Sequence, residues 1–412
     1  MKTRLCSLAI MILATVAATF ADDTLWRGTM TPYNLAVTPA PVPDSLVPVG
    51  VIHVARHGAR YMTSPKNVDR LREALDKAAG EGNVTAMGER MQDVLYRIDS
   101  LSDGRWGMLD AVGRQEERRL AEQLRAEMPE ALTRGQVQAW STYVPRAIMS
   151  MYSFTYRLAT LSPYLNIQTH EGPRQDTLLR FFDTDPEYVA YLKDGAWKGV
   201  YKEYYDRTVP VRPAISMVGR LSGYSEAHLR DITMAAYEVI RSFDAMGQEF
   251  DPSAYFTDEE LMACWKVSNL RHYLQRSATR VSDVPAAAAI PLLNAIFDGI
   301  DRIDTDTSPL RGLFYFAHAE TLMPLFSLID LPGCNAPDVA TDEVWRVWQD
   351  ARIVPLAANL DIEIYRTPSG ETLISTVLNG ERVAPSQGLP LMPTREALQQ
   401  KWVESAEKMQ SE

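Results

Sequence analysis

Cysteine is scarce in this chain of 412 residues, which contains only three. Cys6 lies near the N-terminus, and Cys264 and Cys334 are the other two. Two cysteines in the body of the chain allow at most one disulfide, which excludes a fold held together by a disulfide framework. This scarcity fits a bacterial periplasmic protein better than a eukaryotic secreted one.

Long apolar runs are also rare, and the clearest one lies at the N-terminus. Lys2 and Arg4 precede an apolar core, Leu8–Ala18, and small residues that offer cleavage sites follow. This pattern is typical of a secretory signal peptide over residues 1–21, and its core is too short to span a membrane. We find no later apolar stretch of 18 residues, so we expect a secreted or periplasmic protein without a membrane span.

An excess of positive charge is missing as well. The formal net charge is -11, and it becomes -13 without residues 1–21, which carry two basic residues and no acidic one. Such a charge disfavours nucleic acid as a partner, and an anionic substrate would need a local positive pocket. The sequence also lacks a P-loop, a dinucleotide-binding glycine motif, internal repeats and low-complexity segments.

What the sequence does contain is a polar cluster directly after an apolar run. Val49–Ala55 is β-branched and apolar and predicts a buried strand, and Arg56-His57-Gly58-Ala59-Arg60 follows it. In open α/β sheets, ligands bind at the carboxyl ends of strands. An imidazole is a competent nucleophile, and guanidiniums fit phosphate oxygens. The alternative is an ordinary surface loop, which the preceding buried run disfavours.

A second strand-to-helix junction carries another arginine. Val137–Ser141 predicts a strand, Pro145 is typical of a helix start, and residues 147–161 form an apolar helix. Arg146 therefore lies where backbone N–H groups favour anions. It either completes a phosphate clamp or is a helix-end arginine in a salt bridge, and we favour the clamp.

Two segments resemble a known family. Residues 56–63 resemble the Arg-His-Gly-x-Arg-x-Pro-Thr signature of the histidine acid phosphatases, with Met62 in place of proline. His318-Ala319-Glu320, at the end of an apolar run from Leu313, resembles the variant found in multiple inositol polyphosphate phosphatases, where most of the superfamily has His-Asp. The resemblance runs from Val49 to the last strands. It implies an α/β fold with a phosphoglycerate-mutase-like sheet flanked by helices, and a second, mostly helical lobe.

The resemblance also implies roles for these residues. His57 would attack phosphorus and Glu320 would protonate the leaving group. Oxygens of the transferred phosphate would be held by Arg56, Arg60, Arg146 and His318. Because these cations would stabilise the transferring phosphate, we expect no metal and no cofactor. The partner would be a small phosphate ester, namely an inositol polyphosphate such as phytate.

Three further basic residues are candidate substrate contacts. Arg27 and Lys66 flank the signature, and Arg180 opens an Arg-Phe-Phe-Asp segment that resembles one in the family. If they line a cleft between two lobes, each could contact a phosphate that is not being cleaved. For Arg180, an ordinary surface position is the competing interpretation.

The domain organisation follows from a change of pattern in the middle of the chain. We expect an α/β domain over residues 22–171 and 283–412, and a helical insertion over 172–282, to which 66–105 could contribute. Residues 22–48 are rich in proline and lack periodicity, so we expect an extended lead-in.

Other activities remain open from the sequence alone. A phosphatase of broader specificity could act on sugar or glycerate phosphates, and a non-catalytic protein could bind phosphate esters. Ser225 faintly resembles a serine hydrolase nucleophile, but it lacks a preceding strand. A metal pair of His53 with His57 is conceivable, although a packed core histidine is favoured, and the isolated His170, His228 and His272 are assigned no role. The oligomeric state is left open.

Overall fold

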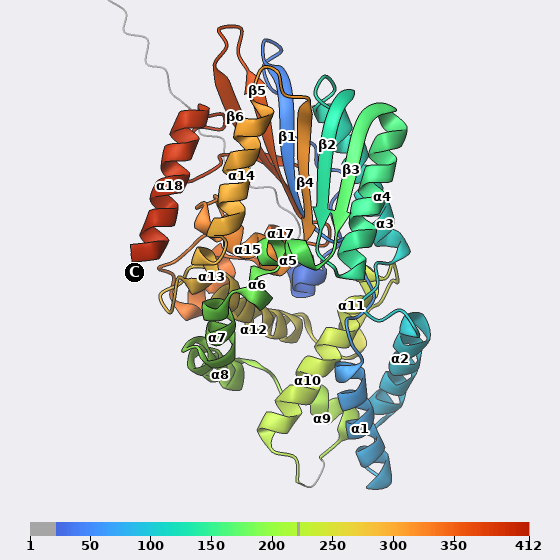
Figure 1. Cartoon of the computed structure of the whole chain (residues 1–412). Coiled ribbons are helices and arrows are strands. Elements are labelled where there is room, and N and C mark those ends of the chain that lie inside the picture. The colour runs from blue at the N-terminus through green and yellow to red at the C-terminus, as the bar shows by residue number, and fades with distance from the viewer. Residues whose placement is uncertain (1–21, 221–222, 412) are drawn as a thin grey trace, which may run out of the picture.

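The computed structural model describes residues 22–220 and 223–411 (Figure 1). The predicted signal peptide, residues 1–21, lies outside this range. A single sheet of seven strands forms the upper half of the molecule in Figure 1, and helices cover both of its faces and continue below the ends of its strands. The predicted α/β fold class is therefore confirmed.

The sheet is mixed, in the order β3-β2-β4-β1-β5-β6-β7. Its strands are β1 Val47–Arg56, β2 Arg134–Ser141, β3 Tyr164–Glu171, β4 Leu310–Ala317, β5 Asn359–Arg366, β6 Thr372–Leu378 and β7 Glu381–Val383. The first four in the spatial order are parallel, and the remaining pairs are antiparallel. The register of β1 and β4 places Arg56 opposite Ala317, so the residues that follow these two strands emerge side by side.

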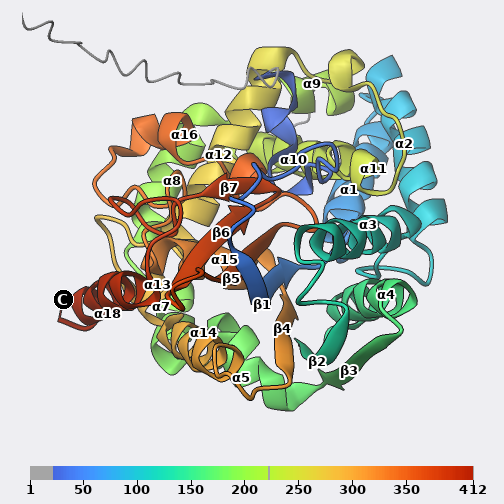
Figure 2. The same ribbon diagram turned by 90° about the horizontal axis from the view of Figure 1, so that it is seen from above.

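The two faces of β1 bury different helices because successive side chains of a strand point to opposite faces. Val51 and Ala55 pack with helices α3 (Ala111–Glu127) and α4 (Pro145–Leu161). Ile52 and Val54 pack on the other face with α14 (Ile290–Ile303) and α15 (Ala319–Leu328). The view from above in Figure 2 shows α3 and α4 on the opposite side of the sheet from α14.

A separate buried cluster lies among helices below the sheet. It joins α1 (Lys66–Gly80), α2 (Ala86–Ser102), α9 (Arg212–Val218), α10 (Glu226–Ile240) and α12 (Asp258–Arg276). The helices of residues 176–208, by contrast, bury aromatic side chains in the cluster that contains α14 and α15. The exact lobe boundaries remain a prediction.

The remaining helices are short or peripheral. They are η1 Asp22–Met30, η2 Pro173–Gln175, α5 Asp176–Leu179, α6 Phe181–Thr184, α7 Pro186–Asp194, α8 Trp197–Thr208, α11 Ser242–Ala245, η3 Pro252–Ala254, α13 Val284–Ala287, η4 Thr341–Glu343, α16 Val344–Val347, α17 Asp350–Ile353 and α18 Arg395–Ser411.

The expected extended lead-in is wrong for its first third. Residues Asp22–Met30 form the 3₁₀ helix η1, and Leu25 and Trp26 are buried in the helical cluster. Tyr237 of α10 donates a hydrogen bond to the carbonyl of Trp26. These contacts to distant helices stabilise η1, which is why local periodicity does not reveal it.

Two expectations about the chain as a whole can be compared with the structure. Cys264 and Cys334 are both buried and free, so the one disulfide that the sequence allowed is not formed between them. Among the described residues, Val284–Ile303 is long and apolar enough to cross a membrane by those two criteria alone, although we expected no later apolar stretch of 18 residues. Half of it is buried, and Gly299 lets it approach Ile52 and Leu313 of the sheet, as in a core helix of a globular domain.

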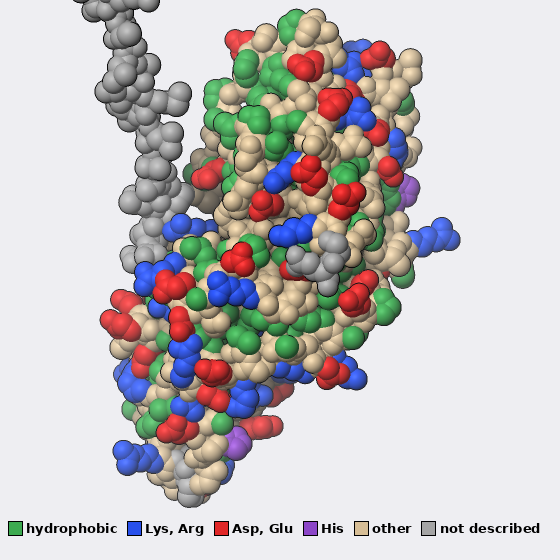
Figure 3. Space-filling model, turned by 90° about the vertical axis from the view of Figure 1, so that its left-hand side faces the viewer, with side chains coloured by type: hydrophobic (Ala, Val, Ile, Leu, Met, Phe, Trp, Pro, Cys, Tyr) green, Lys and Arg blue, Asp and Glu red, His purple; other side chains and the backbone are tan. Residues whose placement is uncertain are grey.

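Surface charge is mixed rather than segregated on the face shown in Figure 3, where basic and acidic side chains lie intermingled. Several of the arginines have a nearby carboxylate partner, for example Arg207 with Asp342 and Arg395 with Asp301. Exposed pairs of this kind contribute little stability, typically below about 1 kcal/mol.

Candidate active site

His57 follows β1 directly, and its environment selects one tautomer. Its Nδ1 lies 2.9 Å from the carbonyl oxygen of Gly58. A carbonyl can only accept, so Nδ1 carries the hydrogen and Nε2 keeps its lone pair. Burial, together with the charges of Arg146 and Arg56, holds the pKa of the His57 imidazole well below its usual range. Nε2 is therefore an unprotonated nucleophile even in mildly acidic solution.

The parallel register brings a second histidine to the same place. The backbone N–H of His57 donates to the carbonyl of Ala317 at 3.2 Å, and the His57 and His318 ring centroids are 5.6 Å apart. Nε2 of His318 lies 3.1 Å from Oγ1 of Thr142, which follows β2. Burial and the nearby Arg146 lower the pKa of His318 to about 3. Three neighbouring strand ends thus converge on one spot.

Three guanidiniums surround these histidines. Arg56 donates to the carbonyls of Thr29 and Val354, both at 2.6 Å, and Arg60 donates to the carbonyl of Tyr61 at 3.0 Å. Burial, with the mutual repulsion of the arginines, lowers the pKa of Arg56 to about 10 and that of Arg60 to about 9. Neither they nor Arg146 form a salt bridge with any other described residue, and the Nε of each is buried without a partner. A cluster of this kind favours an anion.

The charge of Glu320 raises the pKa of all three arginines, against the effect of their burial. It is the second residue of α15, immediately after the end of β4. Burial alone would raise the pKa of the Glu320 carboxyl, but the positive charge of Arg276 and the groups around it hold that pKa well below its usual range. Without a ligand Glu320 is therefore ionised, and a bound anion would shift its pKa upward.

Buried groups behind the Arg-His-Gly loop fix its backbone. The carboxylate of Glu116 on α3 accepts from the backbone N–H of Ala59 at 2.7 Å, and Ser150 accepts from that of Gly58 at 3.1 Å. A Cβ on Gly58 would lie 2.7 Å from the carbonyl oxygen of Gly113, so only glycine permits this approach. Sequence analysis missed Glu116 because a polar residue on a charged helix looks solvent-exposed.

The predicted nucleophile, proton donor and clamp are brought together at one wall of a cavity of about 710 Å³. His57, Glu320, Arg56, Arg60 and Arg146 line it. His318 lies against the ring of His57 but is not itself among the residues that line the cavity. Their chemical roles remain predictions at this point, although their convergence is an observation.

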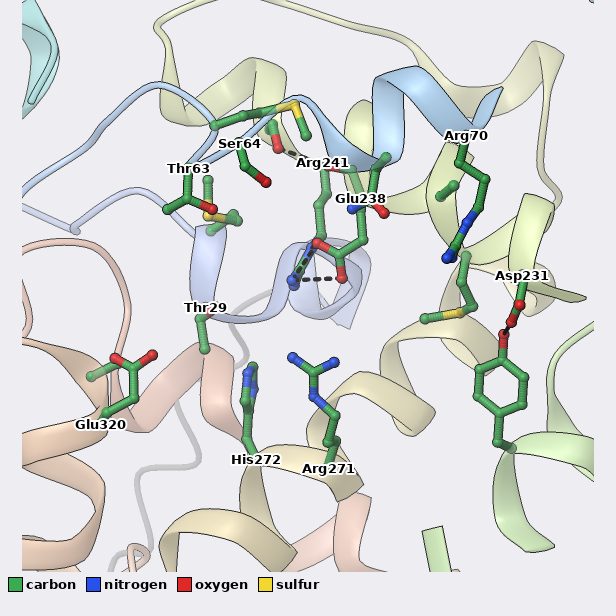
Figure 4. Close-up of a pocket in the computed structure, with 18 of the residues that line it drawn as sticks. Thr29, Thr63, Ser64, Arg70, Asp231, Glu238, Arg241, Arg271, His272 and Glu320 are labelled. Atoms are coloured by element: carbon green, nitrogen blue, oxygen red, sulfur yellow. Dashed lines mark hydrogen bonds and ion pairs between the residues drawn. The ribbon is translucent and has the colours of Figure 1, made fainter. Parts of the chain in front are cut away.

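Much of the rest of the cavity is lined by helices, whose side chains were given no role from the sequence. They include Arg70, Lys202, Glu238, Arg241, Arg271 and His272. Figure 4 shows His272 and Arg271 projecting from one helix into the space that Glu320, Glu238 and Arg241 also face. Isolated basic residues on helices carry no sequence signal that separates them from surface positions. Within residues 22–220 and 223–411, no three His, Cys, Asp or Glu side chains gather as a metal site would require.

The tentative substrate contacts lie further from the cavity. Arg27 pairs with Asp244, Arg180 pairs with Asp183, and Lys66 is exposed at the start of α1. None of the three is among the described residues that line the cavity. Arg180 is nevertheless close enough to lower the pKa of Arg146, after burial and against the effect of Glu320. Their role in substrate binding stays a prediction.

The other sequence candidates have structural explanations. Ser225 is the N-cap of α10 and accepts from the backbone N–H of His228. His53 is packed among Phe154, Phe314 and Phe316, and its Nδ1 lies 2.6 Å from a carboxylate oxygen of Asp361. That supports the core-histidine interpretation over a metal pair with His57.

A histidine whose Nε2 is free, set among buried arginines at parallel strand ends, defines the site of a histidine phosphatase. Residues 49–379 match the family model of the histidine phosphatase superfamily (branch 2), and the chain belongs to this family. The predicted superfamily and enzyme class are thereby confirmed, which removes the serine hydrolase alternative.

Known proteins resemble the chain over most of its length. It is 25% identical over 420 residues to multiple inositol polyphosphate phosphatase 1 of Homo sapiens, covering 93% of this chain and 81% of that protein. The Gallus gallus protein of the same name is 24% identical, covering 82% and 77%. The crystal structure of the Bifidobacterium longum multiple inositol polyphosphate phosphatase with inositol hexasulfate aligns with a TM-score of 0.71 at 17% identity, covering 90% and 93%. The D. castellii phytase aligns with a TM-score of 0.69 at 15% identity, covering 93% and 85%.

Proposed function

We propose that the protein removes phosphate groups from inositol polyphosphates by transferring each phosphoryl group to Nε2 of His57. The observation that carries the proposal is the hydrogen bond from Nδ1 of His57 to the Gly58 carbonyl, which leaves Nε2 free beside three guanidiniums. The names of the similar human, chicken and Bifidobacterium longum proteins support the inositol polyphosphate class of substrate.

In the first chemical step, the lone pair of Nε2 attacks phosphorus as the ester bond to the leaving oxygen breaks. Arg56, Arg60, Arg146 and His318 would stabilise the equatorial oxygens, whose charge dominates the cost of phosphoryl transfer. Glu320, in its protonated form, gives its proton to the leaving alkoxide. In the second step, water attacks the phosphohistidine, Glu320 takes a proton from that water, and inorganic phosphate and free His57 are released.

Glu320 must gain a proton before it can act, although it is ionised in the free enzyme. The incoming phosphate group is a dianion, and it offsets the cations that hold the pKa of Glu320 low. Substrate binding thus supplies the conditions under which Glu320 becomes a proton donor, and mildly acidic solution favours this state. His57 stays neutral under the same conditions because its own pKa is lowered.

The predictions about export, metal ions and the range of substrates also form part of the proposal. Residues 1–21 support export to the periplasm or outside the cell. The cations of the clamp do the electrostatic work, so activity should survive EDTA. A broader specificity for sugar or glycerate phosphates is the second candidate, because the clamp itself needs only one phosphate group.

The test is product profiling of inositol hexakisphosphate digestion by the purified protein. We expect stepwise release of phosphate, retained in EDTA, and a fall in kcat on the order of 10⁴-fold or more for His57→Ala, since no other group can take the nucleophile's place. His228→Ala is the matched control, because His228 lies on α10 and is not among the residues lining the cavity. Wild-type turnover in His57→Ala would refute the mechanism, and cleavage of sugar phosphates but not of the hexakisphosphate would establish the broader specificity.

A further inference from the structure

A histidine without an assigned role stands on the helical wall of the cavity. Nδ1 of His272 lies 2.7 Å from Oδ2 of Asp350, which is completely buried. The His272 side chain is 16% exposed and lines the cavity. With Nδ1 engaged by the carboxylate, Nε2 is the ring nitrogen left to meet a ligand.

The orientation of His272 is fixed by a network along one side of α12. Trp265, Asn269 and His272 are spaced by about one helical turn, so their side chains lie above one another. The indole of Trp265 donates to Oδ1 of Asp350 at 2.9 Å, and Oδ1 of Asn269 accepts from the backbone N–H of Asp350 at 2.8 Å. Both carboxylate oxygens of Asp350 are thus hydrogen-bonded, and these bonds hold the carboxylate in place beside the imidazole.

The segment that contains Asp350 also contacts Arg56 of the phosphate clamp. Asp350 begins α17, and the carbonyl of Val354, just past the end of α17, accepts from Arg56 at 2.6 Å. Four residues of helix span roughly 6 Å. His272 and Arg56, the last residue of β1, are therefore both tied to one turn of chain. Both also line the cavity, so a ligand that fills it meets the imidazole as well as the clamp.

The chemistry of the dyad favours a phosphate over a neutral group. The oxygens of a phosphate dianion only accept, so Nε2 carries a hydrogen when it binds one, and the imidazole, whose Nδ1 is bonded to Asp350, is then a cation. Asp350 balances that charge. Glu238 of α10 and Arg241, the C-cap of that helix, form an ion pair. Basic groups outnumber acidic ones among the other charged residues that line the cavity, which are Arg56, Arg60, Arg70, Arg146, Lys202, Arg271, Asp206, Asp231 and Glu320.

We propose that His272, oriented by Asp350, is a substrate-binding residue that donates a hydrogen bond from Nε2 to a second phosphate of the inositol polyphosphate, one that is not being cleaved. This inference rests on the proposed function. It assigns His272 to recognition of polyphosphorylated substrates, while the transferred phosphate remains with the clamp.

The test compares His272→Ala with wild type on inositol hexakisphosphate and on 4-nitrophenyl phosphate, which has a single phosphate. We expect kcat/KM for the hexakisphosphate to fall about tenfold more than for the monoester, mainly through KM, the size expected for one charge-assisted hydrogen bond. Calorimetric binding of inositol hexasulfate, which does not depend on turnover, should weaken about tenfold as well. His272→Gln is a second variant that keeps a polar group beside Asp350, and His228→Ala is the matched control.

Equal losses on both substrates, or unchanged affinity for the hexasulfate, would overturn the assignment of His272. If wild type releases no phosphate from the hexakisphosphate, the proposed function fails and this inference fails with it. If wild type cleaves the hexakisphosphate normally and only the His272 comparison is negative, the inference alone is wrong.

Discussion

The two walls of the candidate active-site cavity differ in how far their cations are paired with carboxylates. At the strand ends, Arg56 is buried, Arg60 and Arg146 are partly buried, and none of the three forms a salt bridge with another described residue. On the helical wall, Arg241 is held by both oxygens of Glu238 at 2.9 Å, and Lys202 pairs with Asp206. Figure 4 shows the Arg241–Glu238 pair facing the cavity.

Under the proposed function, this difference would separate the residues that carry out phosphoryl transfer from those that recognise the substrate. Unneutralised cations in a buried site repel one another, as the lowered pKa values of Arg56 and Arg60 show. Such a cluster stabilises folding poorly, and it persists where a charged ligand or transition state completes it. On the helical wall, two of the cations are paired, whereas Arg70 and Arg271 form no ion pair with another described residue. Under the proposed function, we expect this wall to select substrates through individual contacts, with modest effects on rate.

The sharpest way to break the comparison is to remove Glu320, the carboxylate that faces the clamp. An inositol alkoxide leaves poorly without a proton, whereas a nitrophenolate leaves readily, so the loss should depend on the substrate. For Glu320→Gln we expect single-turnover rates on inositol hexakisphosphate to fall roughly 10² to 10⁴-fold, and those on 4-nitrophenyl phosphate to fall far less. Glu343→Gln, which alters a surface glutamate paired with Arg346, is the control. Equal losses on the two substrates would contradict a proton-donor role.

A smaller effect concerns the pH dependence of stability, which tests whether the pKa of His57 is lowered in the folded protein. The folded-state pKa of His57 lies well below that of an unfolded chain, near 6.5. Below pH 6.5, His57 binds a proton in the unfolded chain but stays unprotonated in the folded protein. Acid therefore lowers the free energy of unfolding of wild type through this group. In His57→Asn this contribution is absent. The free energy of unfolding of the variant should therefore rise relative to wild type by about 1 to 2 kcal/mol between pH 7 and pH 5.

The measurement is urea unfolding at several pH values, with His228→Ala as a control that removes a histidine outside the cavity. Absolute curves are not decisive, because the buried Glu117, whose pKa burial raises well above its usual range, contributes with the opposite sign. The difference between variant and wild type isolates His57. Parallel curves for wild type and His57→Asn would show that burial and the nearby arginines do not lower the pKa of this imidazole.

Sequence patterns revealed the strand-end wall far better than the helical wall. Val49–Ala55 predicts a strand, which is observed as Val47–Arg56. A short apolar run rich in β-branched residues is typical of a buried strand. The Asn379-Gly380 pair predicts a hairpin turn, and both residues have the positive φ that this turn needs, 50° and 86°. Local rules of this kind locate the strands, and the two signature segments follow β1 and β4.

Residues whose role depends on tertiary packing were not predictable. Glu116, Glu238 and His272 sit on helices where polar residues normally face water, and only the packing of other elements turns them inward. The helix η1 is another case, since its burial depends on Tyr237 and other residues far along the chain. Periodicity finds an apolar helix face, but it cannot distinguish a polar side chain in a cavity from one in solvent.

The smallest expected effect is that of Arg180, which is paired like Arg241 but also acts electrostatically on the clamp. Its guanidinium pairs with Asp183 and lies 4.7 Å from the centroid of the Tyr143 ring, yet its charge reaches Arg146. A paired and partly screened cation contributes weakly to binding a distant phosphate. We expect Arg180→Ala to raise KM for inositol hexakisphosphate about two- to fivefold at low ionic strength, with kcat nearly unchanged.

The salt dependence decides whether that change is electrostatic. Screening acts over about 8 Å at physiological ionic strength, so the KM difference between Arg180→Ala and wild type should shrink as salt is added. Arg207→Ala is a closely matched control, because Arg207 also pairs with an aspartate, Asp342, and also lies 4.7 Å from a tyrosine ring, that of Tyr204. It lies outside the residues that line the cavity. If both variants behave like wild type on the hexakisphosphate and on a monoester, Arg180 is a surface residue, and recognition rests on the helical wall alone.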